Sequence, residues 1–324
     1  MEKAEPNHNI KKRNYKLKEQ NMEQVAVRAG YACLNLSLKE SFRNYRLATV
    51  EKEDEEKITQ VIWHNIRLLR EIVEYNIKHN IYVYRVSSDL VPFCTHPYVK
   101  ALYEEKVLNN EEMYHHFTTI RMLQEQYNLR MSIHPSQFNV LSSPKKEVVS
   151  RSVNEINAQT EWIKALKGEN VVIHVGGSYG DKKSALQRFK ENLRYVDQNL
   201  ISIENDDKTY NVEEVVEICQ NKHIKWVYDY HHDRCHPSIE KDVKALIKNY
   251  PPNKYHLSTG TPHSDSRPHA DYISATDYAN FTSFLTSCGI KQADVIFEAK
   301  KKNKAIFHIL EPIGNGYWQL EGNN

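Results

Sequence analysis

Hydrophobic and polar positions follow two alternating periods along most of the chain. Short apolar runs typical of strands buried on both faces are separated by longer segments in which apolar residues recur every three to four positions, as in amphipathic helices. The predicted strands are 25–33, 81–86, 129–133, 170–175, 200–203, 225–229, 254–257 and 293–298, and the predicted helices are 51–79, 111–127, 146–166, 183–196, 212–221, 238–249, 275–287 and 300–310.

This alternation predicts an α/β fold. Eight strand–helix units in about 290 residues fit a closed (β/α)8 TIM barrel, in a single domain over 23–311, better than an open sheet. The glycine-rich turn of a dinucleotide-binding fold is absent, which counts against a doubly wound sheet. Residues 1–22 are basic and poor in apolar side chains, so we expect a disordered tail there, with a DNA-binding arm as the alternative. Residues 312–324 are expected to form a second tail.

Polar side chains stand where most of the apolar runs end, although a buried strand does not need them. The carboxyl ends of barrel strands face one shared bowl, so side chains there can meet. Imidazoles mixed with carboxylates, without thiolates, suit Mn²⁺, Zn²⁺ or Fe²⁺, and a carboxylate such as Glu204 can bridge two ions about 3.5–4 Å apart. The candidates at the strand ends are His134, His174, Glu204, Asp229, His232, His256 and Glu298. Any one alone is most simply a buried histidine or acid, but their recurrence predicts a metal site.

Two further residues extend this site. His269 follows the seventh strand and, with His232, could hold a third ion; the alternative is a solvated loop histidine. Lys254 precedes His256 by two residues on the same strand face, and so would tune the ligands or contact phosphate. The alternative is a lysine of the barrel interior neutralised by a carboxylate.

Overall composition and net charge do not identify the substrate, so the evidence for it must come from local features of the sequence. The 44 Lys and Arg residues against 42 Asp and Glu residues give a net charge of +2, which does not by itself indicate a nucleic-acid partner. Cations in the loops after the strands, such as Lys145, Lys182, Arg234 and Arg267, could form a positive rim suited to a polyanion, unless the acids among them neutralise it. Five scattered cysteines and the lack of a membrane-spanning run indicate a cytoplasmic protein with reduced thiols, which we expect to be monomeric.

Nine short motifs in these loops and strand ends resemble the UV damage endonuclease family. They are GYACLNL at 30–36, VPFCTHP at 91–97, SIHPSQ at 132–137, HVGGSYG at 174–180, ENDD at 204–207, DYHH at 229–232, HLS at 256–258, PHA at 268–270 and EAK at 298–300. The resemblance implies a TIM barrel related to endonuclease IV. It also implies an enzyme that nicks UV-damaged double-stranded DNA immediately 5′ to cyclobutane pyrimidine dimers and 6-4 photoproducts, and at abasic sites. Such an enzyme would be associated with the nucleoid, or nuclear in a eukaryote.

The same resemblance implies roles for individual residues. Two or three divalent ions are expected, usually Mn²⁺, with Zn²⁺, Mg²⁺ or Co²⁺ as alternatives. His134, His174 and Glu204 would hold the first, Glu204, Asp229, His256 and Glu298 the second, and His232 and His269 the third. Tyr31, Gln137 and Phe138 would probe the lesion, with Asn35 and His96 beside them, and Lys254 matches a lysine that the family can carry in modified form. Position 138 is commonly tyrosine in the family, so Phe138 keeps the stacking surface and loses the phenol hydroxyl.

The expected mechanism is an in-line displacement at phosphorus by a metal-activated water, with Glu204 and Asp229 acting through the ions. Damaged base pairs stack poorly, so extruding them costs less than extruding healthy ones, and this difference could supply the lesion preference. One alternative is a metal-dependent sugar isomerase or epimerase of the TIM-barrel type. The other is a protein that binds damaged DNA without cutting it.

Overall fold

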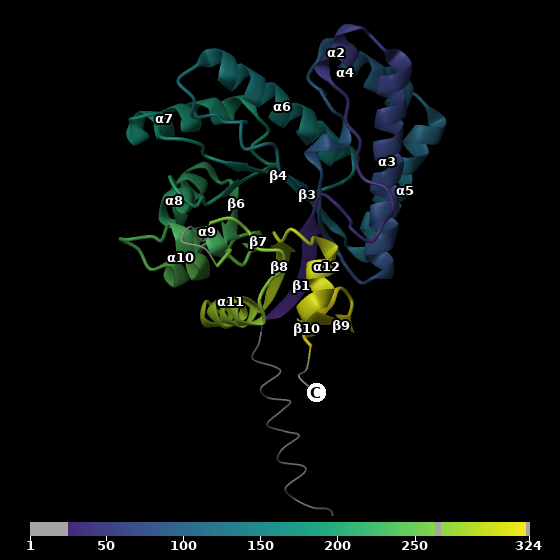
Figure 1. Ribbon diagram of the computed structural model, residues 1–324. Helices are drawn as coiled ribbons and strands as arrows, with labels where there is room; N and C mark the ends of the chain where they lie inside the picture. The colour runs from purple at the N-terminus through teal and green to yellow at the C-terminus, as the bar shows by residue number, and fades with distance from the viewer. Residues whose placement is uncertain (1–24, 263–266, 322–324) are drawn as a thin grey trace, which may run out of the picture.

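The computed structural model describes residues 25–262 and 267–321, and in that part of the chain eight parallel strands close into a barrel (Figure 1). Each strand pairs with the next, and β1 pairs with both β2 and β8, which closes the ring. The strands are β1 (Ala26–Ala32), β2 (Val83–Val86), β3 (Arg130–Ile133), β4 (Asn170–His174), β5 (Ile201–Glu204), β6 (Lys225–Asp229), β7 (Lys254–Leu257) and β8 (Gln292–Phe297). The predicted (β/α)8 barrel is therefore confirmed.

Helices surround this barrel, and Figure 1 shows α3 and α5 side by side on one flank with α7, α8 and α10 on the opposite flank. They are α3 (Glu55–Lys78), α5 (Glu111–Tyr127), α6 (Lys146–Ala165), α7 (Lys182–Asn192), α8 (Val212–Lys222), α10 (Val243–Asn249), α11 (Ala275–Ser287) and α12 (Asn303–Ile309). The expected helix over 238–249 is shorter than predicted. The Glu213 carboxylate accepts the backbone N–H groups of Glu240 and Lys241, which holds that segment outside the helix, and Asp242 then caps α10.

Several short elements were not predicted. They are α2 (Leu47–Glu51), η1 (Ser88–Leu90), α4 (Pro97–Tyr103), the π-helix η2 (Glu104–Leu108) and α9 (Tyr230–Cys235). The predicted helix 183–196 is found as α7 followed by the 3-10 helix η3 (Leu193–Tyr195). Pro97 begins α4 because its fixed φ suits the first helical position. Asp229 ends β6 and caps α9 by accepting the N–H of His232 at 2.7 Å, so the chain turns back at the end of the strand. Among the described residues, no helix is long and apolar enough to cross a membrane.

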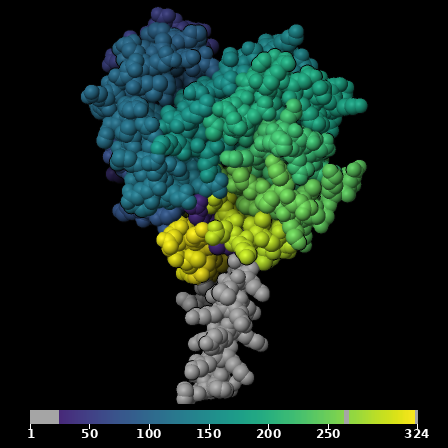
Figure 2. Space-filling model, turned by 180° about the vertical axis from the view of Figure 1, so that it is seen from behind, coloured from purple at the N-terminus to yellow at the C-terminus, as the bar shows by residue number. Residues whose placement is uncertain are grey.

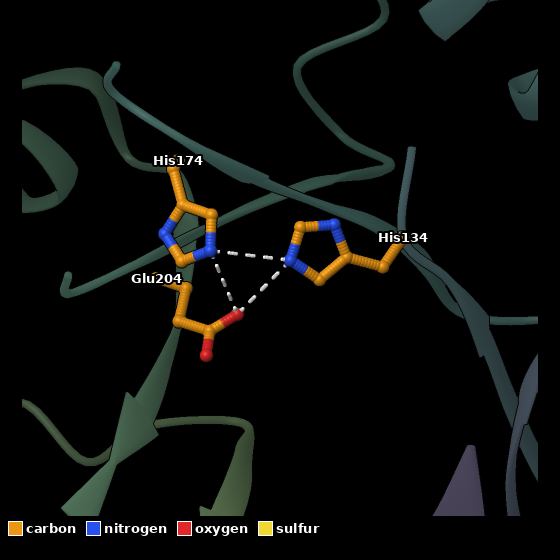
Figure 3. A group of neighbouring side chains, drawn as sticks. All are labelled: His134, His174 and Glu204. Atoms are coloured by element: carbon orange, nitrogen blue, oxygen red, sulfur yellow. Dashed lines mark hydrogen bonds and ion pairs between the residues drawn. The ribbon is translucent and has the colours of Figure 1, made fainter. Parts of the chain in front are cut away.

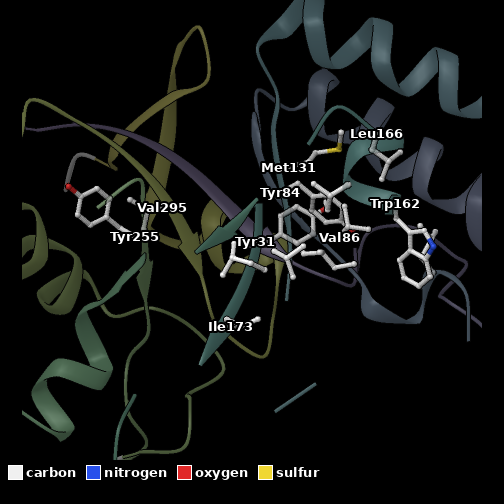
Figure 4. Close-up of a cluster of buried hydrophobic side chains, with 14 of the residues drawn as sticks. Tyr31, Tyr84, Val86, Met131, Trp162, Leu166, Ile173, Tyr255 and Val295 are labelled. Atoms are coloured by element: carbon white, nitrogen blue, oxygen red, sulfur yellow. The ribbon is translucent and has the colours of Figure 1, made fainter. Parts of the chain in front are cut away.

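Buried aromatic and aliphatic side chains fill the space between strands and helices (Figure 4). Tyr31 of β1 and Tyr84 of β2 pack with their ring centroids 5.3 Å apart. The barrel closes tightly beside them, since a Cβ added to Gly30 would lie only 2.0 Å from the carbonyl oxygen of Val83. Glycine at position 30 therefore permits the close approach of β1 to β2.

The C-terminal tail predicted from residue 312 is corrected by the structure. β9 (Leu310–Gly314) and β10 (Tyr317–Leu320) form a hairpin, which belongs to the yellow C-terminal region at the lower end of the coloured part of Figure 2. β2 first pairs with β1 at Gly30, and β10 pairs with the earlier part of β1, matching Val27 with Trp318. The hairpin thus covers a strand edge and buries Trp318. The N-terminal tail predicted over 1–22 lies outside the described residues.

A charged network occupies the barrel near the first residues of the strands. Arg28 Nε lies 2.5 Å from Asp294 Oδ1, and Arg130 pairs with both Asp294 and Glu169. Burial alone would raise the pKa of Asp294, but the hydrogen bonds from Arg28 and the charge of Arg130 bring it below its ordinary value. The network links β1, β3 and β8 across the interior.

Replacing Asp294 by asparagine is expected to lower the free energy of unfolding by about 3 kcal/mol at pH 7, because the buried Arg28 and the half-buried Arg130 lose their shared partner. The folded-state pKa is depressed, so the stabilisation is complete above the unfolded value of about 4 and is lost as the pH falls through the folded value. Urea unfolding from pH 7 down to pH 3 measures this. As a control, Asp271→Asn removes an exposed partner of Lys301 and should cost under about 0.5 kcal/mol. Equal costs for the two variants would contradict the account.

Candidate metal centre

Histidines and acids from six successive strands meet at one end of the barrel. His174, Glu204 and Asp229 are the last residues of β4, β5 and β6, while His134 and Glu298 directly follow β3 and β8, and His256 lies in β7. The strand register aligns His174 with Glu204 and Asp229 with His256. Because all these strands run parallel, their last side chains face the same bowl.

The first ligand group contains His134, His174 and Glu204 (Figure 3). The Nε2 atoms of the two imidazoles are 3.3 Å apart, and they lie 3.4 and 3.8 Å from Oε2 of Glu204. Figure 3 shows both rings turned toward that oxygen. Two imidazole nitrogens and one carboxylate oxygen this close together match the ligand set of a divalent cation.

Glu204 belongs to two more groups, one with Asp229 and His232 and one with His256 and Glu298. Its Oε1 is 2.8 Å from His256 Nδ1 and 3.8 Å from His232 Nδ1. His256 Nδ1 also lies 3.3 Å from Glu298 Oε1. Glu204 is therefore the residue common to every ligand group found in the described part of the chain.

The charges of this cluster are set by burial and by its neighbours. Burial would raise the pKa of Glu204, but the facing His256 and His174 lower it well below its ordinary range, so it stays ionised. Burial would lower the pKa of His232, but the carboxylates of Asp229 and Glu204 raise it to about 9. A cation bound at His232 would therefore compete with a proton.

Two buried polar atoms of the cluster test whether metal ions fit. Asp229 Oδ2 and His256 Nε2 are both shielded from solvent and have no hydrogen-bond partner among the described residues. Leaving such atoms unsatisfied costs roughly 1–3 kcal/mol each, and more for a charged group. Oxygen and imidazole nitrogen donors are also the ligands that Mn²⁺ and Zn²⁺ accept. The residues present fit divalent cations.

The predicted third site, made by His232 and His269, is only loosely assembled. The two ring centroids are 6.3 Å apart, and His269 Nδ1 lies 3.7 Å from Glu298 Oε2. His269 is held at the bowl by a bridge between its backbone and that of Gly260. His232 lies nearer to Glu204 and Asp229 than the sequence suggested, because α9 returns it over the end of β6.

Lys254 does not face the bowl, and the expectation that it contacts phosphate is corrected. It begins β7, two residues before His256, which sets it deeper by about 6.6 Å at 3.3 Å per residue. Its side chain is buried, and Nζ lies 3.5 Å from Glu169 Oε2 in the charged network. Desolvation lowers the pKa of Lys254 to about 8 against the opposing charge of Glu169. The alternative of an interior lysine neutralised by a carboxylate describes its position.

Tyr31 and Asn35 also differ from the expected lesion-probing role. Tyr31 has no exposed surface, and its hydroxyl donates to Asn76 Oδ1 at 2.7 Å and accepts from Asn35 Nδ2 at 2.9 Å. Asn35 is buried and accepts the N–H of Ser37. Both side chains are committed to holding the loop after β1, because a buried phenol and amide must find partners.

The loop after β3 presents the other proposed probe. Gln137 is exposed, and Phe138 is 78% exposed, which is unusual for a large apolar side chain. His96 is half-buried at the start of α4, and its Nδ1 has no partner within the described residues. Sequence reasoning thus identified the exposed aromatic and amide on this loop, but not which of the other candidates are buried.

Arg85 and Asn205 are site residues that the sequence reasoning missed. Arg85 of β2 is half-buried and pairs with Glu298. Burial would raise the pKa of Glu298, but the charges of Arg85 and His256 bring it well below its ordinary value. Asn205 exchanges two hydrogen bonds of 2.9 Å with the backbone of Asp229. The available signal was an arginine inside an otherwise apolar strand.

The positive rim is partly neutralised. Lys182 lies 2.6 Å from Glu214, and Arg234 lies 2.6 Å from Asp277. Arg267 approaches Asp207 at 3.7 Å. Glu214 of α8, Asp277 of α11 and Asp207 of the loop after β5 therefore neutralise these cations, so a polyanion would have to displace them to bind there.

Comparisons with known proteins agree with this geometry. The family model described as UV-endonuclease UvdE matches residues 27–318. A UV DNA damage endonuclease of Bacillus cereus (strain G9842) is 31% identical over 276 residues, which cover 81% of this chain and 85% of that protein. Another from Bacillus velezensis (strain DSM 23117 / BGSC 10A6 / LMG 26770 / FZB42) is 33% identical over 289 residues, covering 84% of this chain and 86% of the relative.

Among solved structures, the crystal structure of SacUVDE superposes with a TM-score of 0.73 at 26% identity, covering 86% of this chain and 95% of that one. The match to the family model ends at residue 318, inside β10, so it extends beyond the motifs into the C-terminal hairpin. The chain therefore belongs to the UV-endonuclease UvdE family.

Proposed function

We propose that the protein is a metal-dependent DNA endonuclease that nicks UV-damaged double-stranded DNA immediately 5′ to cyclobutane pyrimidine dimers and 6-4 photoproducts, and at abasic sites. The observation that carries the proposal is the meeting of three ligand groups on Glu204 at the strand ends. The names of the curated relatives, UV DNA damage endonuclease, support the substrate class.

Two or three divalent ions would occupy the centre, with Mn²⁺ favoured and Zn²⁺, Mg²⁺ or Co²⁺ as alternatives. His134, His174 and Glu204 would hold one, Glu204, Asp229, His256 and Glu298 a second, and His232 with His269 a third. When bound, such ions activate water as a nucleophile and neutralise charge on the phosphate undergoing hydrolysis.

The protein's own residues prepare the centre. Asn205 ties the end of β5 to the end of β6, which fixes Asp229 relative to Glu204. Arg85 positions Glu298 and keeps it ionised. The side chains of His134 and His174 are 16% and 23% exposed, so the centre is open on the side where a phosphodiester would approach. Buried, fixed ligands of this kind reduce the reorganisation needed during reaction.

Lesion recognition is assigned to the loop after β3. Phe138 can stack on bases at a disrupted step, and Gln137 can hydrogen-bond to bases that have lost their partners. Because the exposed loop begins at His134, a probe inserted into the duplex would stand next to the metal centre. Binding of the lesion and placement of the adjacent phosphodiester would then be coupled.

Gln137→Ala is expected to reduce the preference for irradiated over intact duplex by about tenfold, because one hydrogen-bonding contact to unpaired bases is lost. The ratio of kcat/KM for the two DNAs measures it. Gln187→Ala, an exposed change on α7, serves as the control. A ratio unchanged in Gln137→Ala would assign recognition to duplex shape alone.

A first experiment tests the proposed function itself. Incubation of the wild-type chain and Mn²⁺ with supercoiled plasmid, irradiated or not, is expected to relax only the irradiated plasmid. Incubating a panel of aldoses with the same protein and Mn²⁺ should leave the sugars unchanged. Isomerised sugar with intact irradiated plasmid would overturn the proposal.

A further inference from the structure

Arg188 of α7 differs from the neutralised cations of the rim, because it forms no ion pair with any acid in the described part of the chain. Its Nε donates to the carbonyl oxygen of Ser142, in the loop after β3, at 2.9 Å. Asp181, which caps α7, accepts from the N–H and the hydroxyl of Ser184 instead. A guanidinium carries five N–H donors, so the terminal nitrogens of Arg188 stay available to an anion.

An exposed aromatic ring lies beside this guanidinium. Cζ of Arg188 is 6.0 Å from the ring centroid of Tyr179, which is 47% exposed. Side chains on a helix tilt toward its N-terminus, so Arg188 reaches back to the residues that precede α7. Tyr179 has a φ of 50°, a left-handed conformation that a bulky residue rarely adopts. Strain of this kind persists where surrounding contacts impose it and is frequent at binding sites.

The loops after β3 and β4 hold the pair firmly. Asn192 of α7 donates from Nδ2 to the carbonyl oxygen of Leu141 at 2.8 Å, so α7 is bonded to two consecutive carbonyls of the loop after β3. A Cβ added to Gly176 would lie 2.6 Å from the hydroxyl oxygen of Ser142, which shows how closely the two loops pack. These loops follow the two histidines of the first ligand group, so the pair flanks the metal centre.

We propose that Arg188 and Tyr179 bind one phosphate and the adjoining deoxyribose of the DNA backbone, next to the lesion-probing loop. The inference rests on the proposed function and adds to it a contact that reads no base. The planar fork of a guanidinium matches two phosphate oxygens. The tyrosine ring keeps the guanidinium in place by a cation–π contact and presents an apolar face to the sugar.

The anchor and the lesion probe lie on the same loop. Ser142, which receives Arg188, follows Phe138 by four residues, a span of at most about 14 Å. With one phosphate per 3.4 Å of helix axis on each strand, the bound phosphate would lie within a few base pairs of an inserted Phe138. Every duplex offers such a phosphate, so the contact strengthens binding of intact and damaged DNA equally and leaves discrimination to the probe.

The test measures the salt dependence of DNA binding. Intact duplex, which the protein does not nick, is titrated with the full chain and Mn²⁺ by fluorescence anisotropy, from about 50 to about 300 mM salt. Arg188→Gln is expected to raise Kd about tenfold and to reduce the slope of log Kd against log salt by about one. KM for nicking dimer DNA should rise by a similar factor. Arg188→Lys keeps the charge and should recover the slope.

A second arginine–tyrosine pair provides the matched control. Arg194 and Tyr195 are exposed on η3, with Cζ 4.7 Å from the ring centroid. They lie just before β5, at the end of the barrel opposite the bowl. Arg194→Gln removes the same charge and should keep the wild-type Kd and slope. Equal losses of slope in Arg188→Gln and Arg194→Gln would reduce the effect to net charge and overturn the inference.

The remaining outcomes separate this role from a structural one. A purely structural Arg188 would lower the melting temperature and leave the slope unchanged. Tyr179→Ala keeps the bond from Arg188 to Ser142 and is expected to raise Kd about threefold. If Arg188→Gln does not fold, a wild-type Kd in Tyr179→Ala overturns the inference. An unchanged slope in Arg188→Gln, with nicking of dimer DNA intact, overturns this inference alone. Absence of nicking by the wild type overturns the proposed function, whatever the slope.

Discussion

Glu204→Gln is expected to lower the rate of nicking at a photodimer by at least about 10³-fold. Glutamine keeps the shape of the side chain but removes the negative charge that faces His134, His174 and His256. All three ligand groups lose a member at once, because each contains Glu204. Affinity for the damaged duplex should change little, since Phe138 and Gln137 remain. Single-turnover rates at saturating Mn²⁺ and a separate binding titration measure the two effects.

Glu169→Gln is the matched control for this experiment. Glu169 is also a largely buried carboxylate inside the barrel, but it pairs with Arg130 and Lys254 and belongs to no ligand group in the described residues. It should reduce stability while retaining most of the nicking activity. If Glu204→Gln cleaves as well as Glu169→Gln under saturating Mn²⁺, the role assigned to Glu204 is wrong.

Removing divalent ions with a chelator is expected to abolish nicking, and adding Mn²⁺ back should restore it. The barrel should stay folded, because its core is apolar and its charged network lies away from the centre. Ion at 100 times its dissociation constant would add about 2.7 kcal/mol to the free energy of unfolding. Nicking rates and thermal unfolding, followed across additions of Mn²⁺, Zn²⁺, Mg²⁺ and Co²⁺, measure activity and binding separately. Full activity after dialysis against chelator would contradict the metal assignment.

The hydrophobic pattern was sufficient to predict the barrel, because each buried strand can be recognised from a short stretch of neighbouring residues. Buried parallel strands read as continuous apolar runs, so β3 to β8 could be located within a few residues. The hairpin of β9 and β10 was not predicted because its strands are short and mostly exposed, so they lack the continuous apolar run of a buried strand. Trp318 was the available signal, since its burial depends on pairing with β1.

The candidate metal ligands could be predicted because they lie at the ends of apolar strands. The wrong assignments arose because the sequence does not show how deep in the barrel an inward-pointing side chain lies. A polar residue that ends an apolar strand reaches the bowl, which located Glu204 and Asp229. A polar residue earlier in the strand can also point inward but lies deeper, and the sequence does not give that depth. Lys254, near the start of β7, pairs with Glu169 in the charged network deep in the barrel. Arg85, near the end of β2, instead reaches Glu298 at the metal centre.

The most direct test of the whole account uses an end-labelled duplex with a single thymine dimer, incubated with the wild-type chain and Mn²⁺. The account predicts one product, cut at the phosphodiester immediately 5′ to the dimer, and no product from the same duplex without the dimer. Binding of the damaged duplex without any cut, or cutting that ignores the dimer, would contradict it.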